Sequence, residues 1–461
     1  MSAMPSIRVL ALVTCVAAGA GLPTRSQGTR DIIAARLDAL MTDLHNRALF
    51  SGAVVAGSRS GVIWEKGFGF ANKARGAAFT PGTSSDSGSL AKTFSAALVL
   101  ALQAEGRLRL DEPVQRYVPE IPERAITIRH LLSHSSGLPS DYAYFDPFIP
   151  ANAERTTELL VKVLAEQKPR LAFRPGTAFE YSSIGYDVAS LVAARAARTP
   201  YARLIEERVF RPLNLVSAFL RPARLHAFPD VRTLAYRRGG VDLDLHDVFD
   251  FEHFHGGSNI YISARDLHTW NVALWSGTVA RGARPDIARL ARINGATSGL
   301  TLGSWYRSDK GDAFWYAGHL QGFHNEAFID TRRDQSIVYV SNNTLEPWLQ
   351  HGIVRAIRGI LSGATVGSLT RPAVAAIPKS EWRSLAGTWR MPRGKPLVVR
   401  VAGERATMTY SGVEYQMFPV DGSFFYVPGL HFMIGFARDG DAWARIYLST
   451  NLSEAWGLRA F

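Results

Sequence analysis

The segments of this chain that resemble strands fall into two widely separated groups. Each is a short run of apolar and β-branched residues bounded by Gly, Asp or Ser, which is the pattern of a strand. The runs cover 52–56, 61–66 and 67–71 in the first group, and 300–305, 313–317, 326–330 and 336–341 in the second. Helical patterns cover 34–49 and 349–361, and short helices and loops fill 110–270. The sequence therefore predicts an α+β domain over 31–361, with a sheet assembled from distant segments.

A second unit is predicted after this domain. Residues 362–380 are rich in Ser, Gly, Ala, Thr and Pro, which is typical of a linker. From Trp382 onward, short strand-like runs alternate with Gly or Asp-Gly turns. They cover 396–401, 406–410, 415–420, 424–427, 432–437 and 442–448. We therefore expect residues 381–461 to form a small all-β barrel.

The first twenty residues have the layout of a secretory signal peptide. Arg8 precedes an apolar run, and Ala18-Gly19-Ala20 is an A-x-A-like cleavage site. We expect cleavage near Ala20 and a periplasmic or secreted protein. The alternative is an uncleaved segment that anchors the protein to a membrane. Cys15 follows Thr14, a poor residue before a lipidated cysteine, so we read it as part of the apolar run.

The composition excludes several classes of protein. The chain of 461 residues has one cysteine, so it cannot hold an internal disulfide, a zinc ribbon or an iron–sulfur cluster. Its net charge of +12 is spread along the chain without a run of five Lys or Arg residues. We therefore expect no nucleic-acid partner, and at most an attraction to the anionic cell envelope. The sequence leaves the oligomeric state open.

Candidate chemistry begins at Gly88-Ser89-Leu90-Ala91-Lys92-Thr93. Ser89 and Lys92 are three positions apart, so they share one face of a helix. A serine hydroxyl becomes a useful nucleophile once a base removes its proton, and a desolvated lysine can be that base or a fixed cation. The segment is no P-loop, because Ala91 stands where that motif has Gly.

The surroundings of this segment closely resemble the class C β-lactamase and penicillin-binding-protein-like serine hydrolases. The matching stretches, in the family's order and spacing, are 83–94, 105–114, 127–139, 175–176, 179–186, 256–258 and 263–267. The resemblance covers residues 34–361. It implies a serine β-lactamase/DD-peptidase-like fold, an antiparallel sheet flanked by helices with a helical subdomain. The C-terminal unit resembles the lipocalin-like module found after some of these hydrolases.

The resemblance also assigns roles to residues. Ser89 would be the acylated nucleophile, and Lys92 and Tyr181 would share its activation and proton delivery to the leaving group. Tyr316-Ala317-Gly318 matches the family's third motif, with Gly322-Phe323 at the expected spacing. His319 is rejected as the first residue of that motif, because Gln321 stands where Gly is needed. The backbone N–H groups of Ser89 and His319 would form the oxyanion hole. No cofactor is implied.

Two departures from the family pattern bear on the substrate. Ser183 stands where the Tyr-x-Asn element has Asn, and Tyr316 stands where Lys, His or Trp is found. Tyrosine offers no positive charge to a substrate carboxylate, nor to a Tyr181 phenolate. We therefore expect an esterase or an amidase/peptidase acting on a small ester, amide or peptide. The alternatives are a peptidoglycan DD-carboxypeptidase or β-lactamase, and a non-catalytic binding protein of the same fold.

Two further groups of side chains have a functional and a structural interpretation. Tyr142 and Tyr144, with Phe145 and Phe148, form either an aromatic acyl-binding wall or ordinary packing. A cluster of His and acidic residues could suggest a metal ion, but it lacks the His-Glu-x-x-His arrangement. Its members are His246, Asp247, Asp250, Glu252, His253 and His255. We read this cluster as a polar loop and predict no metal site.

Overall fold

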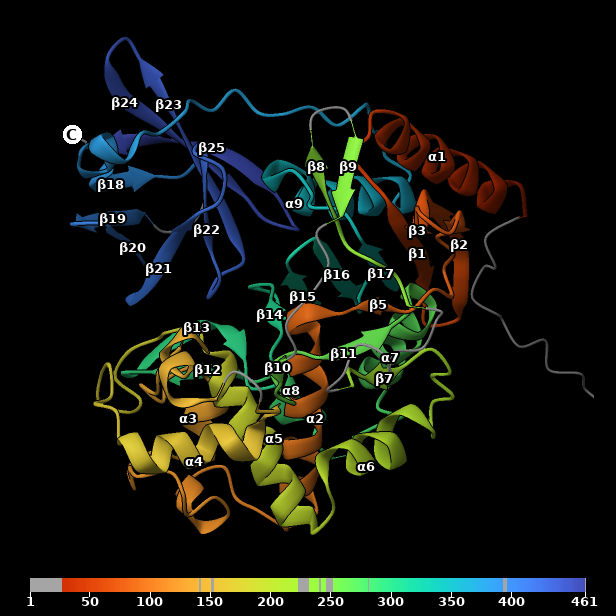
Figure 1. The fold of residues 1–461 in the computed structure, drawn as a ribbon. Coiled ribbons are helices and arrows are strands. Elements are labelled where there is room, and N and C mark those ends of the chain that lie inside the picture. Colours follow the sequence, from red (N-terminus) through yellow and green to blue (C-terminus); the bar gives the residue numbers. More distant parts are fainter. Residues whose placement is uncertain are drawn as a thin grey trace, which may run out of the picture.

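In the computed structural model, the two predicted groups of strands join in one eight-stranded antiparallel sheet (Figure 1). The strand order is β12-β13-β14-β15-β16-β17-β1-β2. The structure describes residues 27–140, 142–150, 153–222, 232–239, 242–245, 252–280, 282–392 and 396–460. The sheet strands are β1 (Gly52–Ser58), β2 (Gly61–Phe68), β12 (Leu290–Ile293), β13 (Ala296–Thr301), β14 (Tyr306–Arg307), β15 (Ala313–Leu320), β16 (Phe323–Asp330) and β17 (Gln335–Ser341). The α+β prediction is confirmed.

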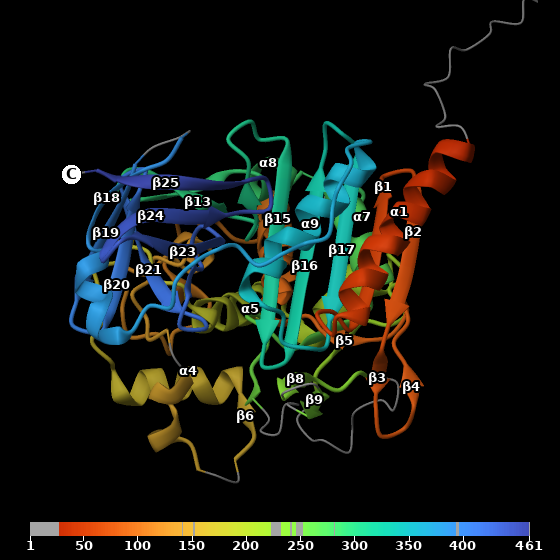
Figure 2. The same cartoon turned by 90° about the horizontal axis from the view of Figure 1, so that it is seen from above.

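Strand β1 joins the two groups. One edge pairs with β17 and the other with β2, so the N-terminal hairpin extends the C-terminal strands. Val54 and Val55 point to opposite faces, and both are fully buried. Helices cover both faces. Helix α7 (Ala264–Ser276) lies on one face, and α1 (Gln27–Asn46) and α9 (Pro347–Leu361) lie on the other (Figure 2).

The strand predicted over 300–305 is wrong in its second half. Strand β13 ends at Thr301, and the following residues turn into β14. Ser304 in this turn has a φ of 63°, a left-handed conformation that cannot continue a strand. The predicted strand 67–71 is divided in a similar way, because Gly69 has a φ of 74° between β2 and β3.

A helical part lies on the α7 side of the sheet (Figure 1). Its central helix, α2 (Ala91–Ala104), packs against α5 (Ser183–Ala197), which also contacts α3 and α4. Side-chain caps define several helix starts, because a hydroxyl accepts from an otherwise unpaired backbone N–H. Ser182 caps α5 in this way. The remaining helices are α3 (Ile128–Leu132), α4 (Thr157–Gln167), α6 (Tyr201–Ile205) and α8 (Arg284–Ile287).

Short strands and single helical turns connect these elements. The three-stranded sheet β5-β11-β7 lies next to the start of α2 and therefore helps to place it. The short strands are β3 (Phe70–Asn72), β4 (Ala77–Ala78), β5 (Ser85–Asp86), β6 (Arg155–Thr156), β7 (Phe219–Leu220), β8 (Tyr236–Gly239), β9 (Asp242–Leu245), β10 (Glu252–His253) and β11 (Ile260–Ile262). The turns are η1 (Gly88–Leu90), η2 (Val114–Arg116), η3 (Tyr142–Tyr144), η4 (Asp146–Phe148), η5 (Glu206–Phe210) and η7 (Lys379–Leu385).

The C-terminal residues form a closed antiparallel barrel, as predicted. Strands β18 and β25 close it, and neither was predicted. Strand β18 is only four residues long, and β25 alternates buried and exposed residues irregularly. Trp389 and Phe436 pack edge to face inside the barrel. The strands are β18 (Gly387–Arg390), β19 (Leu397–Ala402), β20 (Arg405–Tyr410), β21 (Val413–Pro419), β22 (Phe424–Val427), β23 (Phe432–Asp439), β24 (Ala442–Ser449) and β25 (Glu454–Ala460).

The segment predicted as a linker, 362–380, is bonded to both units that it connects. The carbonyl groups of Ala364 and Leu369 accept hydrogen bonds from Arg36 of α1 and from Arg47, which directly follows α1. Farther along, the N–H of Ala375 donates to the Phe436 carbonyl in the barrel. These bonds hold the barrel beside the sheet.

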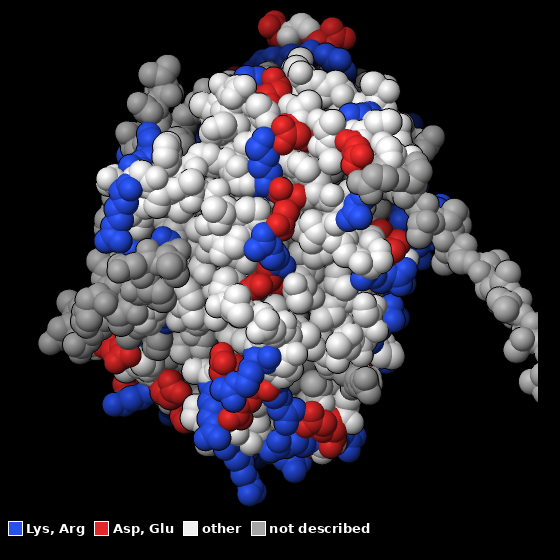
Figure 3. Space-filling model, turned by 90° about the vertical axis from the view of Figure 1, so that its right-hand side faces the viewer, with Lys and Arg blue, Asp and Glu red and all other residues white. Residues whose placement is uncertain are grey.

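The predicted signal peptide and Cys15 lie outside the described residues. Within the described ranges, we find no helix that is both long and apolar enough to cross a membrane. The face seen in Figure 3 intersperses Lys and Arg with Asp and Glu. On this face the excess of basic residues does not gather into a single positive surface.

The buried histidines predict how stability depends on pH. Burial lowers the pKa of His268 on α7 to about 4, from an ordinary value of 6.5. Below pH 6.5 His268 binds a proton in the unfolded chain, whereas in the native chain it does so only below about pH 4. Stability is therefore lost as the pH falls through this window, by up to about 1.4 kcal/mol per pH unit for one such group.

We expect His268→Gln to reduce this slope, since glutamine can keep the hydrogen bond to the Ser336 hydroxyl and does not titrate. The measurement is the free energy of unfolding from urea titrations at several pH values between about 7 and 4. An unchanged slope in the variant would contradict the assignment. The unaltered chain provides the reference slope. Both chains keep the other buried histidines, so the difference between the slopes reports on His268.

Candidate active site

Ser89 lies in η1, at the N-terminal end of α2. Gly88 before it has a φ of 54°, so the chain turns sharply between β5 and the helix. The Lys92 side chain comes from the next turn of the same helix, and its Nζ donates to Ser89 Oγ at 3.2 Å. The predicted contact between the two side chains is therefore present.

Lys92 is fully buried and has three uncharged hydrogen-bond partners. Besides Ser89, its Nζ donates to Ser183 Oγ at 3.0 Å and to the Gly257 carbonyl at 2.7 Å. These partners come from the starts of α2 and α5 and from the loop before β11. One nitrogen thus joins three segments that are far apart in the sequence.

Tyr181 lies directly above the lysine. Lys92 Nζ is 4.9 Å from the centre of the Tyr181 ring. The His134 ring stacks on the Tyr181 ring, with the two ring centres 4.5 Å apart. His134 accepts a hydrogen bond from the Ser182 N–H at 3.0 Å. Burial, and then the charge of Lys92, lower the pKa of His134 to about 3. His134 is therefore a neutral platform for Tyr181 near neutral pH.

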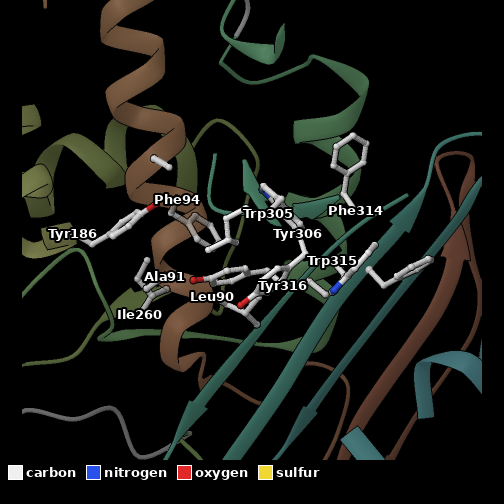
Figure 4. Packing of buried hydrophobic residues seen from close by; sticks show 14 of the residues in the cluster. Leu90, Ala91, Phe94, Tyr186, Ile260, Trp305, Tyr306, Phe314, Trp315 and Tyr316 are labelled. Atoms are coloured by element: carbon white, nitrogen blue, oxygen red, sulfur yellow. The ribbon is translucent and has the colours of Figure 1, made fainter. Parts of the chain in front are cut away.

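Tyr316 approaches Tyr181 from the sheet. The two hydroxyl groups are 3.2 Å apart, and the Tyr316 side chain is fully buried. Figure 4 shows Tyr316 pointing from β15 toward Leu90 and Ala91 at the start of α2. Burial raises the pKa of Tyr316 well above its ordinary value, so this hydroxyl stays protonated. The position where the family resemblance implies Lys, His or Trp thus holds a tyrosine with a neutral hydroxyl.

The backbone of β15 touches the backbone of η1. A Cβ atom on Gly318 would lie 1.8 Å from the Ser87 carbonyl oxygen, and one on Gly88 would lie 2.8 Å from the His319 nitrogen. Only glycine fits at these two points. The Asn325 side chain fixes the contact by donating to the carbonyl groups of Asp86 and Gly318. The backbone next to Ser89 therefore lies against the backbone at His319.

A buried ion pair that the sequence reasoning missed holds the turn that leads to Ser89. Asp86 Oδ1 accepts from the Gly88 N–H at 2.8 Å, and Oδ2 accepts from Arg221 at 2.7 Å. Asp86 is fully buried and Arg221 nearly so. The partners are 135 positions apart, so no local pattern indicated the pair.

A second missed residue, Asp187 on α5, supports the lysine indirectly. Its carboxylate accepts from the Gly257 N–H at 2.8 Å and from the Tyr142 hydroxyl at 2.6 Å. Tyr142 also stacks on Phe254. Tyr142 therefore supports Asp187, which holds Gly257, the residue whose carbonyl group accepts from Lys92.

Tyr144 packs on Phe145 and Phe148 instead. It borders a groove of about 400 Å³ with Gly137, Pro139, Arg170 and Glu180.

The cluster of His and acidic residues that we read as a polar loop is only partly described. His246, Asp247 and Asp250 lie outside the described residues, and Glu252 and His253 form β10. The His255 ring stacks on Tyr201, and the backbone N–H of His255 donates to the Thr157 hydroxyl. In the part of the chain that the structure describes, no three His, Cys, Asp or Glu side chains are grouped so that they could hold a metal ion.

The Asp86–Arg221 pair yields a stability prediction. Asp86→Asn leaves a buried guanidinium without its countercharge, which costs about 3–5 kcal/mol. Adding Arg221→Met should recover part of this loss, because the uncompensated charge is then removed. Urea unfolding midpoints of the single and double variants measure both effects. Asp43→Asn, which breaks the exposed pair with Arg47, is the matched control and should cost less than about 1 kcal/mol. Equal losses in Asp86→Asn and in the control would refute this account.

Comparison with known proteins agrees with this geometry. Penicillin-binding protein 4* of Bacillus subtilis (strain 168) is 23% identical over 443 residues, covering 92% of this chain and 98% of that protein. Among solved structures, the octameric penicillin-binding protein homologue from Pyrococcus abyssi has a TM-score of 0.61 at 17% identity, covering 92% of this chain and 99% of its own. EstCE1, a hydrolase with promiscuous acyltransferase activity, has a TM-score of 0.57 at 19% identity, covering 68% of this chain and 95% of its own. These two structures share the fold. The family model described as Beta-lactamase matches residues 36–359, and the chain belongs to the beta-lactamase family, whose homologues are serine hydrolases.

Proposed function

We propose that this protein hydrolyses small esters or amides through an acyl-enzyme on Ser89. The observation that carries the proposal is the position of Lys92 Nζ, within hydrogen-bond distance of Ser89 Oγ and held by Ser183 and the Gly257 carbonyl. A neutral lysine can donate two N–H groups to the latter two and accept the Ser89 proton with its lone pair. The same three contacts therefore suit the lysine before and after proton transfer.

Acylation would then proceed as follows. Ser89 Oγ attacks the substrate carbonyl while its proton passes to Lys92. The N–H groups of Ser89 and His319 donate to the developing oxyanion. As the bond to the leaving group breaks, that group takes a proton delivered through Lys92 and Tyr181, which is itself bonded to Tyr316. Water attacks the acyl-enzyme in the second half and regenerates Ser89.

The substrate class follows from Tyr316. Its buried, neutral hydroxyl offers no countercharge to a carboxylate, which β-lactams and peptidoglycan stems carry. This favours an esterase or an amidase/peptidase acting on a substrate without a charged group at that point. The similarity to EstCE1, a hydrolase with promiscuous acyltransferase activity, supports a reaction that transfers an acyl group.

A second candidate is a peptidoglycan DD-carboxypeptidase or β-lactamase, favoured by the name of the full-length relative, penicillin-binding protein 4*. A non-catalytic binding protein is disfavoured by the Lys92–Ser89 contact. For location, we propose export through residues 1–20, with a periplasmic or secreted enzyme as the result and an N-terminal membrane anchor as the alternative.

Covalent labelling tests the proposal. The purified full chain should react with a fluorophosphonate probe and should hydrolyse short-chain aryl esters. Ser89→Ala should lose both properties, because the variant lacks the hydroxyl that the proposal makes the nucleophile. Absence of Ser89-dependent labelling would contradict the interpretation of the protein as an enzyme. Strong and slowly released labelling by a fluorescent penicillin would favour the second candidate.

Lysine variants separate the two possible roles of Lys92. If Lys92 is a base, both Lys92→Met and Lys92→Arg should lower kcat/KM by about 10²–10⁴-fold, because a guanidinium keeps its proton. If it were only a fixed cation, Lys92→Arg would retain much of the activity. The measurement is kcat/KM for an aryl acetate, with thermal unfolding of each variant as the control for folding.

A further inference from the structure

The barrel reaches the third motif of the hydrolase part. Strand β16 places Glu326 directly opposite Ala317 of β15, the residue between Tyr316 and Gly318. Glu326 is fully buried. Its Oε2 lies 3.2 Å from Nε2 of His431, a barrel residue that is also fully buried, and its other oxygen accepts from Asn451 of the barrel.

His431 also holds a second barrel side chain. With Nε2 donating to Glu326, its Nδ1 accepts from the Tyr426 hydroxyl at 2.8 Å. Both residues belong to the hairpin of β22 and β23. Because the Glu326–His431 contact is buried on both sides, it fixes the place of Tyr426 relative to β16.

The turn of this hairpin packs against the elements that surround the site. The Tyr306 hydroxyl donates to the Pro428 carbonyl, and the Tyr306 ring stacks on both His431 and Tyr316, at 5.1 and 5.4 Å. The Gly429 Cα lies so close to Phe179, two residues before Tyr181, that a Cβ there would be 2.6 Å from that ring. The turn is therefore wedged between β14 and the Tyr181 loop.

Tyr426 itself is half-buried and stands beside the candidate oxyanion strand. Its ring centre is 6.0 Å from that of His319. Burial first, and then the neighbouring Tyr181, raise the pKa of the Tyr426 hydroxyl well above its ordinary value, so this hydroxyl stays protonated. In the described part of the chain, β14 pairs with β15 only at Phe314 and Trp315, so no strand covers that edge of the third motif.

We infer that Tyr426 is a specificity-determining residue that forms one wall of the substrate site, and that His431, held by Glu326, is the positioning residue for this wall. The inference rests on the proposed function, because it assigns a wall to that same site. The barrel then limits the size of the group that reaches Ser89. A wall of neutral tyrosine hydroxyls also suits an uncharged substrate group.

Substrate series test the inference in the full chain. One series varies the acyl group of 4-nitrophenyl esters from acetyl to octanoyl, and the other varies the alcohol of acetate esters. Tyr426→Ala should change the ratio of kcat/KM between bulky and small substrates by about tenfold or more in at least one series. Ratios are independent of the amount of active enzyme, so partial unfolding does not mimic the effect.

Matched variants separate specificity from barrel stability. Tyr447→Ala removes a tyrosine that packs on Phe424 and Trp456 inside the same barrel, so it should lower the unfolding temperature without changing the ratios. His431→Ala should change the ratios in the direction of Tyr426→Ala, and His431→Gln, which can still bond Glu326 or Tyr426, should partly restore them. A merely structural role of His431 would change stability alone.

Two failures are distinguishable. Unchanged ratios in Tyr426→Ala, with Ser89-dependent turnover intact, would overturn this inference and leave the proposed function standing. Loss of Ser89-dependent turnover in the unaltered chain would overturn the proposed function and, with it, the assignment of a wall to the site.

Discussion

The hydrogen bonds of one buried nitrogen, Lys92 Nζ, are the constraint on which the site depends. Its acceptors lie on Ser89, Ser183 and Gly257, and none of these groups carries a charge. A buried lysine without such partners would be costly, so the three segments that supply them must meet. The helical part, through α2 and α5, and the loop before β11 are thereby tied to a single point. Asp187 reinforces the third of these contacts from behind by holding the Gly257 N–H.

The sheet supplies the second half of the site through a close backbone contact. Gly88 and Gly318 leave no room for side chains between η1 and β15, so the backbone of the strand lies against the turn that carries Ser89. This contact requires β15 to be held rigidly. Its neighbours β16 and β17, and through them β1, provide that rigidity, and both faces of these strands are buried. The pairing of the two distant groups of strands therefore holds β15 at the site as well as completing the sheet.

The sequence predicted the parts of the site that follow from local spacing and from family resemblance. Ser89 and Lys92 share one helix face, and the Tyr181 and Tyr316 motifs stand at recognisable positions, so their meeting could be expected. The residue pairs that support the site could not be predicted in this way. Asp86 and Arg221 are 135 positions apart, and Glu326 and His431 are 105 apart in two different units. Such pairs depend on tertiary packing, and a single sequence shows each partner only as one charged or polar residue among many. Strands β18 and β25 escaped prediction for a related reason, because closure of the barrel, rather than a strong local pattern, makes them strands.

The neutral side chain of Tyr316 explains how the barrel and the site can meet where they do. A lysine at this position would need water or a substrate carboxylate, and a covering aromatic wall would leave its charge unsolvated. A tyrosine can be buried, with its hydroxyl on Tyr181 and its ring against Tyr306. Tyr306 in turn stacks on His431 of the barrel. A neutral aromatic side chain at this position therefore helps to form an apolar surface against which the barrel hairpin can pack. The absence of a positive charge and the contact between the two units are two consequences of the same side chain.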